Sequence, residues 1–186
     1  MKKLLLSTIV ASAVALAGTT NQAFAETPEF DYLQVSHANL DYDAGGDLDG
    51  FEVKWNHELT DSLYLNVDYT NFAESGAKVE STALGLGFMS DVSDSSTFFA
   101  QLDWINAENS FGFDDDGYRA SVGVRSMLTK EFEGKLAYEY TDVGDDDMSV
   151  FVVGGAYNIN KNIALTLDFK KESDFDQTMF GVRYNF

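Results

Sequence analysis

Apolar and polar residues alternate strictly along most of this chain, up to a C-terminal stretch that ends on the aromatic residue Phe186. Such period-two alternation is typical of β-strands with two unlike faces. It places ten strands near residues 30–40, 50–58, 62–72, 79–89, 97–106, 117–127, 132–142, 148–158, 163–172 and 177–186. The pattern predicts an all-β, antiparallel up-and-down barrel with short loops, and eight strands remain the alternative if the weak 79–89 segment or its neighbours are misassigned.

The polarity of the two strand faces indicates the surroundings of this barrel. In the segment 62–72, for example, Leu65 and Val67 alternate with Asn66 and Asp68. A water-soluble barrel would have to bury all its apolar side chains in a narrow bore, which has no room for them. Lipid cannot satisfy free backbone groups, so only helices and closed sheets cross it. We therefore expect a transmembrane barrel with its apolar face outward and its polar face inward.

The N-terminus has the features of a cleaved signal peptide. Lys2 and Lys3 precede an apolar stretch from Leu4 to Gly18, and Ala23-Phe24-Ala25 forms a small-x-small cleavage site. We expect residues 1–25 to be removed and residues 26–186 to form a single outer-membrane barrel domain of a Gram-negative cell. Outer-membrane vesicles are the additional location considered. The absence of cysteine fits an exported chain whose fold is closed by hydrogen bonds.

The chain is strongly acidic, with 31 Asp and Glu against 12 Lys and Arg and a formal charge of −19. This balance excludes nucleic acid as a partner, because no basic patch is present to neutralise phosphates. The acids cluster between predicted strands on one side of the barrel, where they are expected to form acidic outer loops. These runs are Asp41 to Asp49, Asp114 to Asp116, Asp142 with Asp145 to Asp147, and Asp174 with Asp176.

Several segments resemble a family of small outer-membrane and vesicle barrels, whose best-known member was proposed as a quorum-sensing or immune-eliciting factor. The matching segments are 30–35 (FDYLQV), 47–51 (DLDGF), 83–88 (ALGLGF), 116–118 (DGY), 122–126 (VGVRS) and 181–186 (GVRYNF). The glycine–aromatic elements and the terminal aromatic are shared more widely with opacity-type small barrels. The resemblance implies a ten-stranded outer-membrane barrel, and it assigns no catalytic residue.

The inward parity predicts a network of charged side chains in the bore. Its members are Glu52, Lys54, Asp68, Asp103, Arg119, Arg125, Lys135, Glu139, Asp168, Lys170 and Arg183. Unpaired buried charge is costly, so we expect these groups to pair and to fill the bore. The alternative is that they form a selectivity ring in a narrow, low-conductance pore for ions or small solutes.

Catalysis finds little support in the sequence. His37 and His57 have outward parity, where packing at a membrane interface explains them, and neither has a recognisable catalytic partner. Gly-x-Ser-x-Gly and Gly-x-Gly-x-x-Gly motifs do not occur. We expect no enzyme activity and no cofactor.

The first acidic run also approximates the ligand spacing of a calcium loop. The candidate oxygen ligands are Asp41, Asp43, Asp47, Asp49 and Glu52, with Gly46 at the turning position. A solvated acidic loop is the favoured interpretation, because the flanking helices are absent and Gly45 replaces a ligand. The alternative is loose binding of Ca²⁺ or Mg²⁺, which could bridge to lipopolysaccharide phosphates.

Taken together, these features predict a monomeric, integral outer-membrane barrel with a structural or surface-interaction role. Its expected partners are membrane lipid, lipopolysaccharide, and the barrel assembly machinery, which would engage the C-terminal strand ending at Phe186. The alternative function is the narrow pore.

Overall fold

The computed structural model describes residues 27–74 and 76–186, which form a closed sheet preceded by a short irregular segment, residues 27–31. The strands are β1 (Tyr32–Tyr42), β2 (Asp47–Thr60), β3 (Leu63–Glu74), β4 (Ala77–Ser93), β5 (Ser96–Asn109), β6 (Asp114–Met127), β7 (Phe132–Val143), β8 (Asp146–Asn158), β9 (Ile163–Lys171) and β10 (Phe175–Asn185). The predicted ten-stranded barrel is confirmed, and the eight-stranded alternative is wrong. The predicted signal peptide lies outside the described residues.

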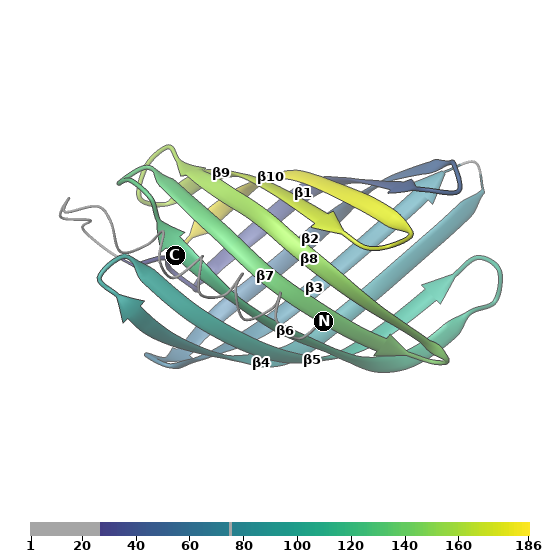
Figure 1. Cartoon of the computed structure of the whole chain (residues 1–186), viewed down its shortest axis with the longest axis horizontal. Coiled ribbons are helices and arrows are strands. Elements are labelled where there is room, and N and C mark those ends of the chain that lie inside the picture. Colours follow the sequence, from purple (N-terminus) through teal and green to yellow (C-terminus); the bar gives the residue numbers. More distant parts are fainter. Residues whose placement is uncertain (1–26, 75) are drawn as a thin grey trace, which may run out of the picture.

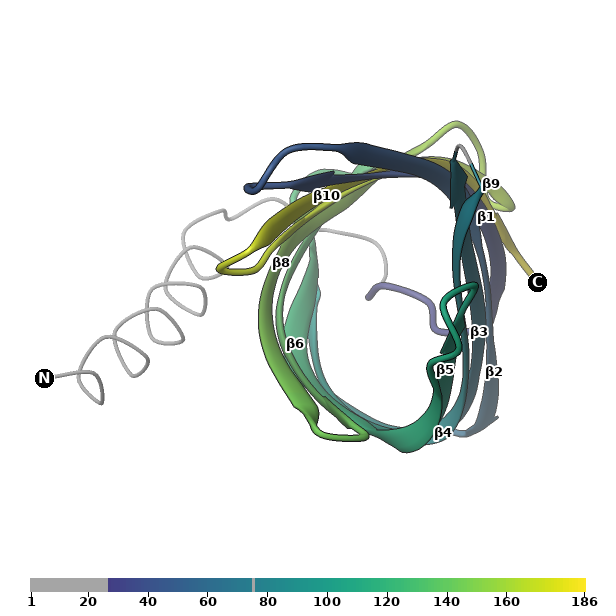
Figure 2. The same cartoon turned by 90° about the vertical axis from the view of Figure 1, so that its right-hand side faces the viewer.

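Each strand pairs with its sequence neighbour in antiparallel register, and β1 closes the sheet by pairing with β10. The closing ladder runs from Tyr32 opposite Asn185 to Tyr42 opposite Phe175. Figure 1 shows the tilted strands from the side, and Figure 2 shows the ring that they form. Closure leaves no sheet edge without a partner, so the strand backbones satisfy one another without water. In the described part of the chain, no helix is long and apolar enough to cross a membrane.

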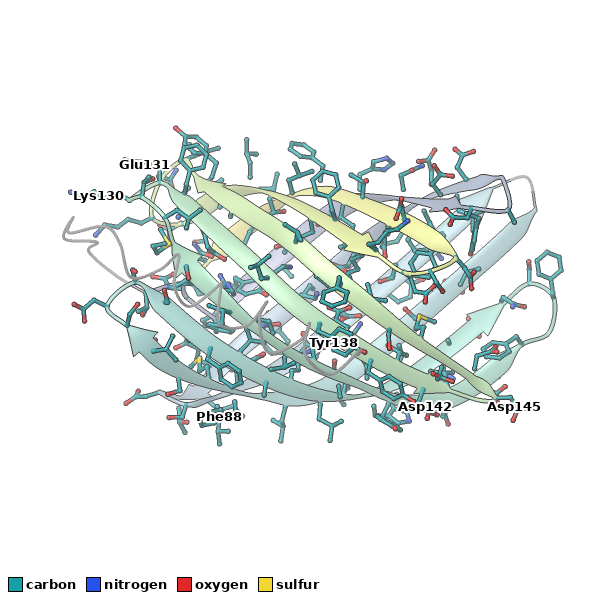
Figure 3. The ribbon with its side chains drawn as sticks, viewed as in Figure 1. Phe88, Lys130, Glu131, Tyr138, Asp142 and Asp145 are labelled. Atoms are coloured by element: carbon teal, nitrogen blue, oxygen red, sulfur yellow. The ribbon has the colours of Figure 1, made fainter. Side chains whose placement is uncertain are left out.

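The two faces of the sheet have opposite polarity. Outward-facing Leu86 and Leu102 are 57% and 60% exposed, whereas inward-facing Asn66 and Asp68 are 0% and 1% exposed. In Figure 3, Phe88 projects away from the barrel. Exposed apolar surface costs about 25 cal/mol per Å² in water. An apolar exterior around a polar interior is therefore suited to lipid, as the alternation predicts.

The two ends of the barrel carry different connections. One end, here called the terminal end, holds residue 27, Phe186 and the turns at 61–62, 94–95, 128–131 and 159–162. The opposite end, here called the loop end, holds the turns at 43–46, 75–76, 110–113, 144–145 and 172–174. In Figure 3, Asp142 and Asp145 mark the loop end, and Lys130 and Glu131 mark the terminal end. The acidic runs gather at the loop end.

The acidic runs do not all lie in loops, which corrects the sequence prediction. Asp114–Asp116 begin β6, and Asp146 and Asp147 begin β8. These carboxylates lie on the paired ends of strands. There the strand pairing extends beyond the residues whose polarity alternates. The true turns are short. Gly45 and Gly46 have φ of 94° and 107°, values that favour glycine, and this geometry explains the Gly-Gly pair in the first loop.

Candidate functional site: the bore of the barrel

The irregular segment before β1, residues 27–31, lies in the bore at the terminal end. In Figure 2 this segment lies inside the ring of strands. Phe30 is 2% exposed and packs against Tyr64 and Phe99, with ring centroids 5.0 and 5.9 Å away. The backbone N–H of Phe30 donates to Glu58 Oε1 over 2.8 Å. An aromatic side chain thus occupies this end of the bore.

Glu133 joins two arginines beside that segment. Arg125 Nε and Nη2 donate to the two oxygens of the Glu133 carboxylate over 2.6 and 3.0 Å, and Arg183 donates to both oxygens as well. Arg125 Nη1 also donates to the carbonyl of Glu29 over 2.8 Å, and its guanidinium lies 4.5 Å from the centre of the Phe30 ring. Arg125 therefore ties the inserted segment to the wall of the barrel.

A second group of polar side chains surrounds Arg119 in the middle of the bore. Arg119 binds Asp103 through Nε and Nη2, over 3.0 and 2.9 Å, and it also binds Asp68. Asn66 Nδ2 and Gln101 Nε2 donate to the Asp103 carboxylate. One guanidinium thereby bridges carboxylates from β3 and β5, which is the kind of pairing that offsets the cost of burying charge.

The remaining inward charges form pairs along the wall. Lys135 Nζ lies 2.7 Å from Asp168 Oδ1, and Lys170 Nζ lies 3.1 Å from Glu139 Oε2. The pair of Lys54 and Glu52 is looser, at 3.8 Å, which is too long for a hydrogen bond.

Glycines make room for this packing. A Cβ added at Gly87 would lie 2.0 Å from Cζ of the Tyr64 ring, and one added at Gly154 would lie 1.8 Å from Asp168 Oδ1. Both glycines face inward. The Tyr64 ring occupies the space that a side chain at Gly87 would need, and the Asp168 carboxylate occupies that space at Gly154. Close packing of this kind leaves a cavity of about 60 Å³ in the middle of the bore, which suffices for a few water molecules.

The structure places all eleven predicted network residues on the inward face. It brings Asp68, Asp103 and Arg119 into one cluster, whereas Arg125 and Arg183 form a separate one. The sequence reasoning missed Glu133, which holds the second cluster together. Its signal was available, because Glu133 shares the inward parity of Lys135 and Glu139 on the same strand. It also missed Phe30 as a bore-filling residue.

The predicted cation-binding loop is not assembled as a ligand set. Asp41, Asp43, Asp47 and Asp49 are exposed at the first hairpin, whereas Glu52 is buried inside the bore. Within residues 27–74 and 76–186, no group of three or more His, Asp or Glu side chains is arranged to hold a metal ion.

The two histidines point outward, as their parity predicts. His37 Nε2 lies 3.5 Å from Asp49 Oδ1, and its side chain is largely exposed. The His57 ring stacks on that of Trp55, and its Nδ1 lies 3.1 Å from Asp31 Oδ1. Both contacts are with surface groups on the outer face of the barrel.

The fold and the packed bore define a small antiparallel transmembrane-type β-barrel. No family model and no curated protein matches the chain. Among solved structures it is similar to the KdgM porin, with 15% identity over 83% of this chain and 99% of that chain and a TM-score of 0.52. A structure described as KdgM porin in complex with disordered oligogalacturonate matches at 15% identity over the same shares of both chains, with a TM-score of 0.50. At this identity the likeness concerns the fold, which is a porin-like barrel.

Proposed function

We propose that the chain is an integral outer-membrane protein with a structural or surface-interaction role and that its bore is closed to steady ion flow. The observation that carries this proposal is that side chains fill the bore both at its terminal end and across its interior. Phe30 occupies the terminal end, and the clusters around Arg119 and Glu133 cross the interior. The small space left between them favours a closed barrel over a pore.

The proposed setting follows from the exterior. The apolar outer face would contact membrane lipid, and the acidic loop end would face the cell surface near lipopolysaccharide. The C-terminal strand, which pairs with β1 and precedes Phe186, would be read by the barrel assembly machinery. Within this setting the chain would act as a monomer, without catalysis, and would belong with the small outer-membrane and vesicle barrels whose motifs it resembles.

A narrow pore is the second candidate function. Two larger spaces favour it, one of about 390 Å³ at the loop end and one of about 490 Å³ at the terminal end, with the packed layer between them. The fold likeness to KdgM, whose structure was described with oligogalacturonate, points the same way. The acidic rim of this chain would repel such a polyanion, so a pore here would favour cations.

Two measurements test these proposals. Cell fractionation combined with a heat-modifiability gel should place a compact, boiling-sensitive species in the outer membrane. Recovery of the folded protein from the soluble fraction would contradict the setting.

Liposomes containing the purified protein should swell no faster in small sugars than empty liposomes. Rapid swelling would favour the pore.

A further inference from the structure

The loop end of the bore carries a larger share of apolar side chains than the charged middle. Two apolar clusters form its walls, and the space between them has a volume of about 390 Å³. The lining includes Leu40, Phe72, Val79, Ile105, Phe113 and Val143. We call this space the vestibule. Its volume lies within the range of small-molecule sites, which is about 300–1,000 Å³.

Charged groups form the floor of the vestibule, and one of them lacks a donor. Arg119 is bound by Asp68 and Asp103, and Lys170 is bound by Glu139. Glu52 also lines the vestibule and is 3% exposed, yet its Oε1 accepts no hydrogen bond within the described residues. Its nearest cation, Lys54 Nζ, is 3.8 Å from that oxygen. A buried carboxylate oxygen without a donor is costly, so this position is suited to a donor from a ligand.

The charge balance of the vestibule lining favours a cationic donor. The carboxylates that line it, Glu52, Glu80, Glu108, Glu139 and Asp146, outnumber the lining cations, Arg119 and Lys170. This excess of negative charge favours a positively charged ligand.

The rim above the vestibule adds to this preference. Asp114–Asp116 and Asp145–Asp147 lie at the loop end, while Lys78 and Lys171 at the same end are already paired with Glu80 and Asp176. In the turn before β10, hydrogen bonds from Ser173 and from the backbone of Asp174 lower the pKa of Glu172, so it is ionised at neutral pH. An acidic rim raises the local concentration of cations and disfavours anions.

We infer that the vestibule binds a small amphipathic cation, with an apolar aromatic or alkyl body against the vestibule walls and one ammonium group that pairs with the Glu52 carboxylate. This binding role goes beyond the proposed structural function, and it holds whether or not the bore conducts. Phe72 and Phe113 supply ring surface for the apolar body. The rim charges guide the ligand in, and Glu52 fixes its polar end.

The test uses the full mature protein in lipid nanodiscs, with empty nanodiscs as the blank for membrane partitioning. The probe is 4-phenylbutylammonium, compared with the neutral 4-phenylbutanol and the anionic 5-phenylvalerate, and binding is followed by calorimetry. We expect saturable binding of the ammonium, with the alcohol at least about 10-fold weaker, because a hydrogen bond to a charged group contributes about 1.5–3 kcal/mol. The carboxylate should bind weakest.

Three variants locate the site. Glu52→Gln should weaken ammonium binding at least about 10-fold while leaving the alcohol nearly unchanged. Ala107→Trp, which fills the vestibule from β5, should weaken both probes. Asp49→Asn removes an acid at the same end but outside the vestibule, and it should change affinity less than about 2-fold. Heat-modifiability gels establish that each variant is folded.

Several results would overturn the inference. These are the absence of saturable ammonium binding to the wild-type protein, equal affinity for the carboxylate, or ammonium binding that survives Glu52→Gln unchanged. If Glu52→Gln fails to fold, binding that persists in folded Ala107→Trp would be decisive against it. None of these outcomes depends on conductance or swelling, so the result is separable from the proposed closed bore.

Discussion

Removing the buried Glu133 carboxylate should destabilise the barrel more than removing an exposed carboxylate from the neighbouring turn. Glu133 is buried and accepts hydrogen bonds from both Arg125 and Arg183. Glu133→Ala leaves two guanidinium groups in the bore without a carboxylate, although Arg125 keeps the carbonyl of Glu29. Breaking a buried ion pair by removing one partner costs about 3–5 kcal/mol, and we expect a loss in this range.

Urea titration of the purified protein folded into lipid vesicles measures this loss, with the fluorescence of Trp55 and Trp104 as the signal. Glu131→Ala is the matched control, because it removes the same side chain from an exposed position two residues away. The control should change the free energy of unfolding by less than about 0.5 kcal/mol.

The same argument predicts a rescue. Buried ion triads can often be replaced by apolar residues of similar volume without loss of stability. The triple variant Glu133→Leu, Arg125→Met and Arg183→Met should therefore be more stable than Glu133→Ala alone. If Glu133→Ala and Glu131→Ala unfold at the same urea concentration, the buried cluster does not stabilise the barrel as argued here.

Three further predictions concern the wall of the barrel. Leu102→Arg puts a charge at a strongly exposed position of the apolar face and should cost about 2–4 kcal/mol in a vesicle unfolding titration, whereas Leu102→Phe should cost little. Equal losses would mean that this face does not contact lipid. Gly87→Val drives a side chain into the Tyr64 ring and should lower the free energy of unfolding by about 1–3 kcal/mol. Gly134→Ala is the control and should be tolerated, because the added Cβ meets only the flexible side chain of Leu128. A Gly87→Val barrel as stable as the wild type would refute the close packing. Deleting Phe186 should lower the yield of heat-modifiable protein in the outer membrane, and an unchanged yield would count against a role of the terminal aromatic in assembly.

Strand positions and faces could be predicted because alternation is a local property of the sequence. The segment 132–142 was placed within one residue of β7, and the side of each bore residue followed from parity. The partners of those residues could not be predicted in the same way. Parity gives the side of the sheet on which a residue lies, but strand tilt and register decide how far along the bore it lies. The contact between Arg119 and Asp68, which are 51 positions apart in the sequence, depends on this register and therefore could not be predicted from parity.

Two features escaped prediction for other physical reasons. The first strand was predicted to begin at residue 30, but β1 begins at Tyr32 and Phe30 turns into the bore. Phe30 shares the inward parity of Tyr32 and Gln34, but parity does not show that its segment leaves the strand and lies inside the ring. The vestibule escaped because its apolar lining, for example Leu40 and Ile105, shares the inward parity that is otherwise polar. In the sequence, the vestibule corresponds to the positions where inward-facing residues are apolar instead of polar.

Single-channel recording in planar bilayers tests the central claim, the closed bore, most directly. The purified wild-type protein should show little or no steady conductance. The double variant Arg119→Ala, Arg125→Ala should leak, because it removes the bridge between Asp68 and Asp103 and the tie that holds the Phe30 segment. Steady, ion-selective channels from the wild-type protein that disappear when these arginines are removed would contradict the account and favour the pore.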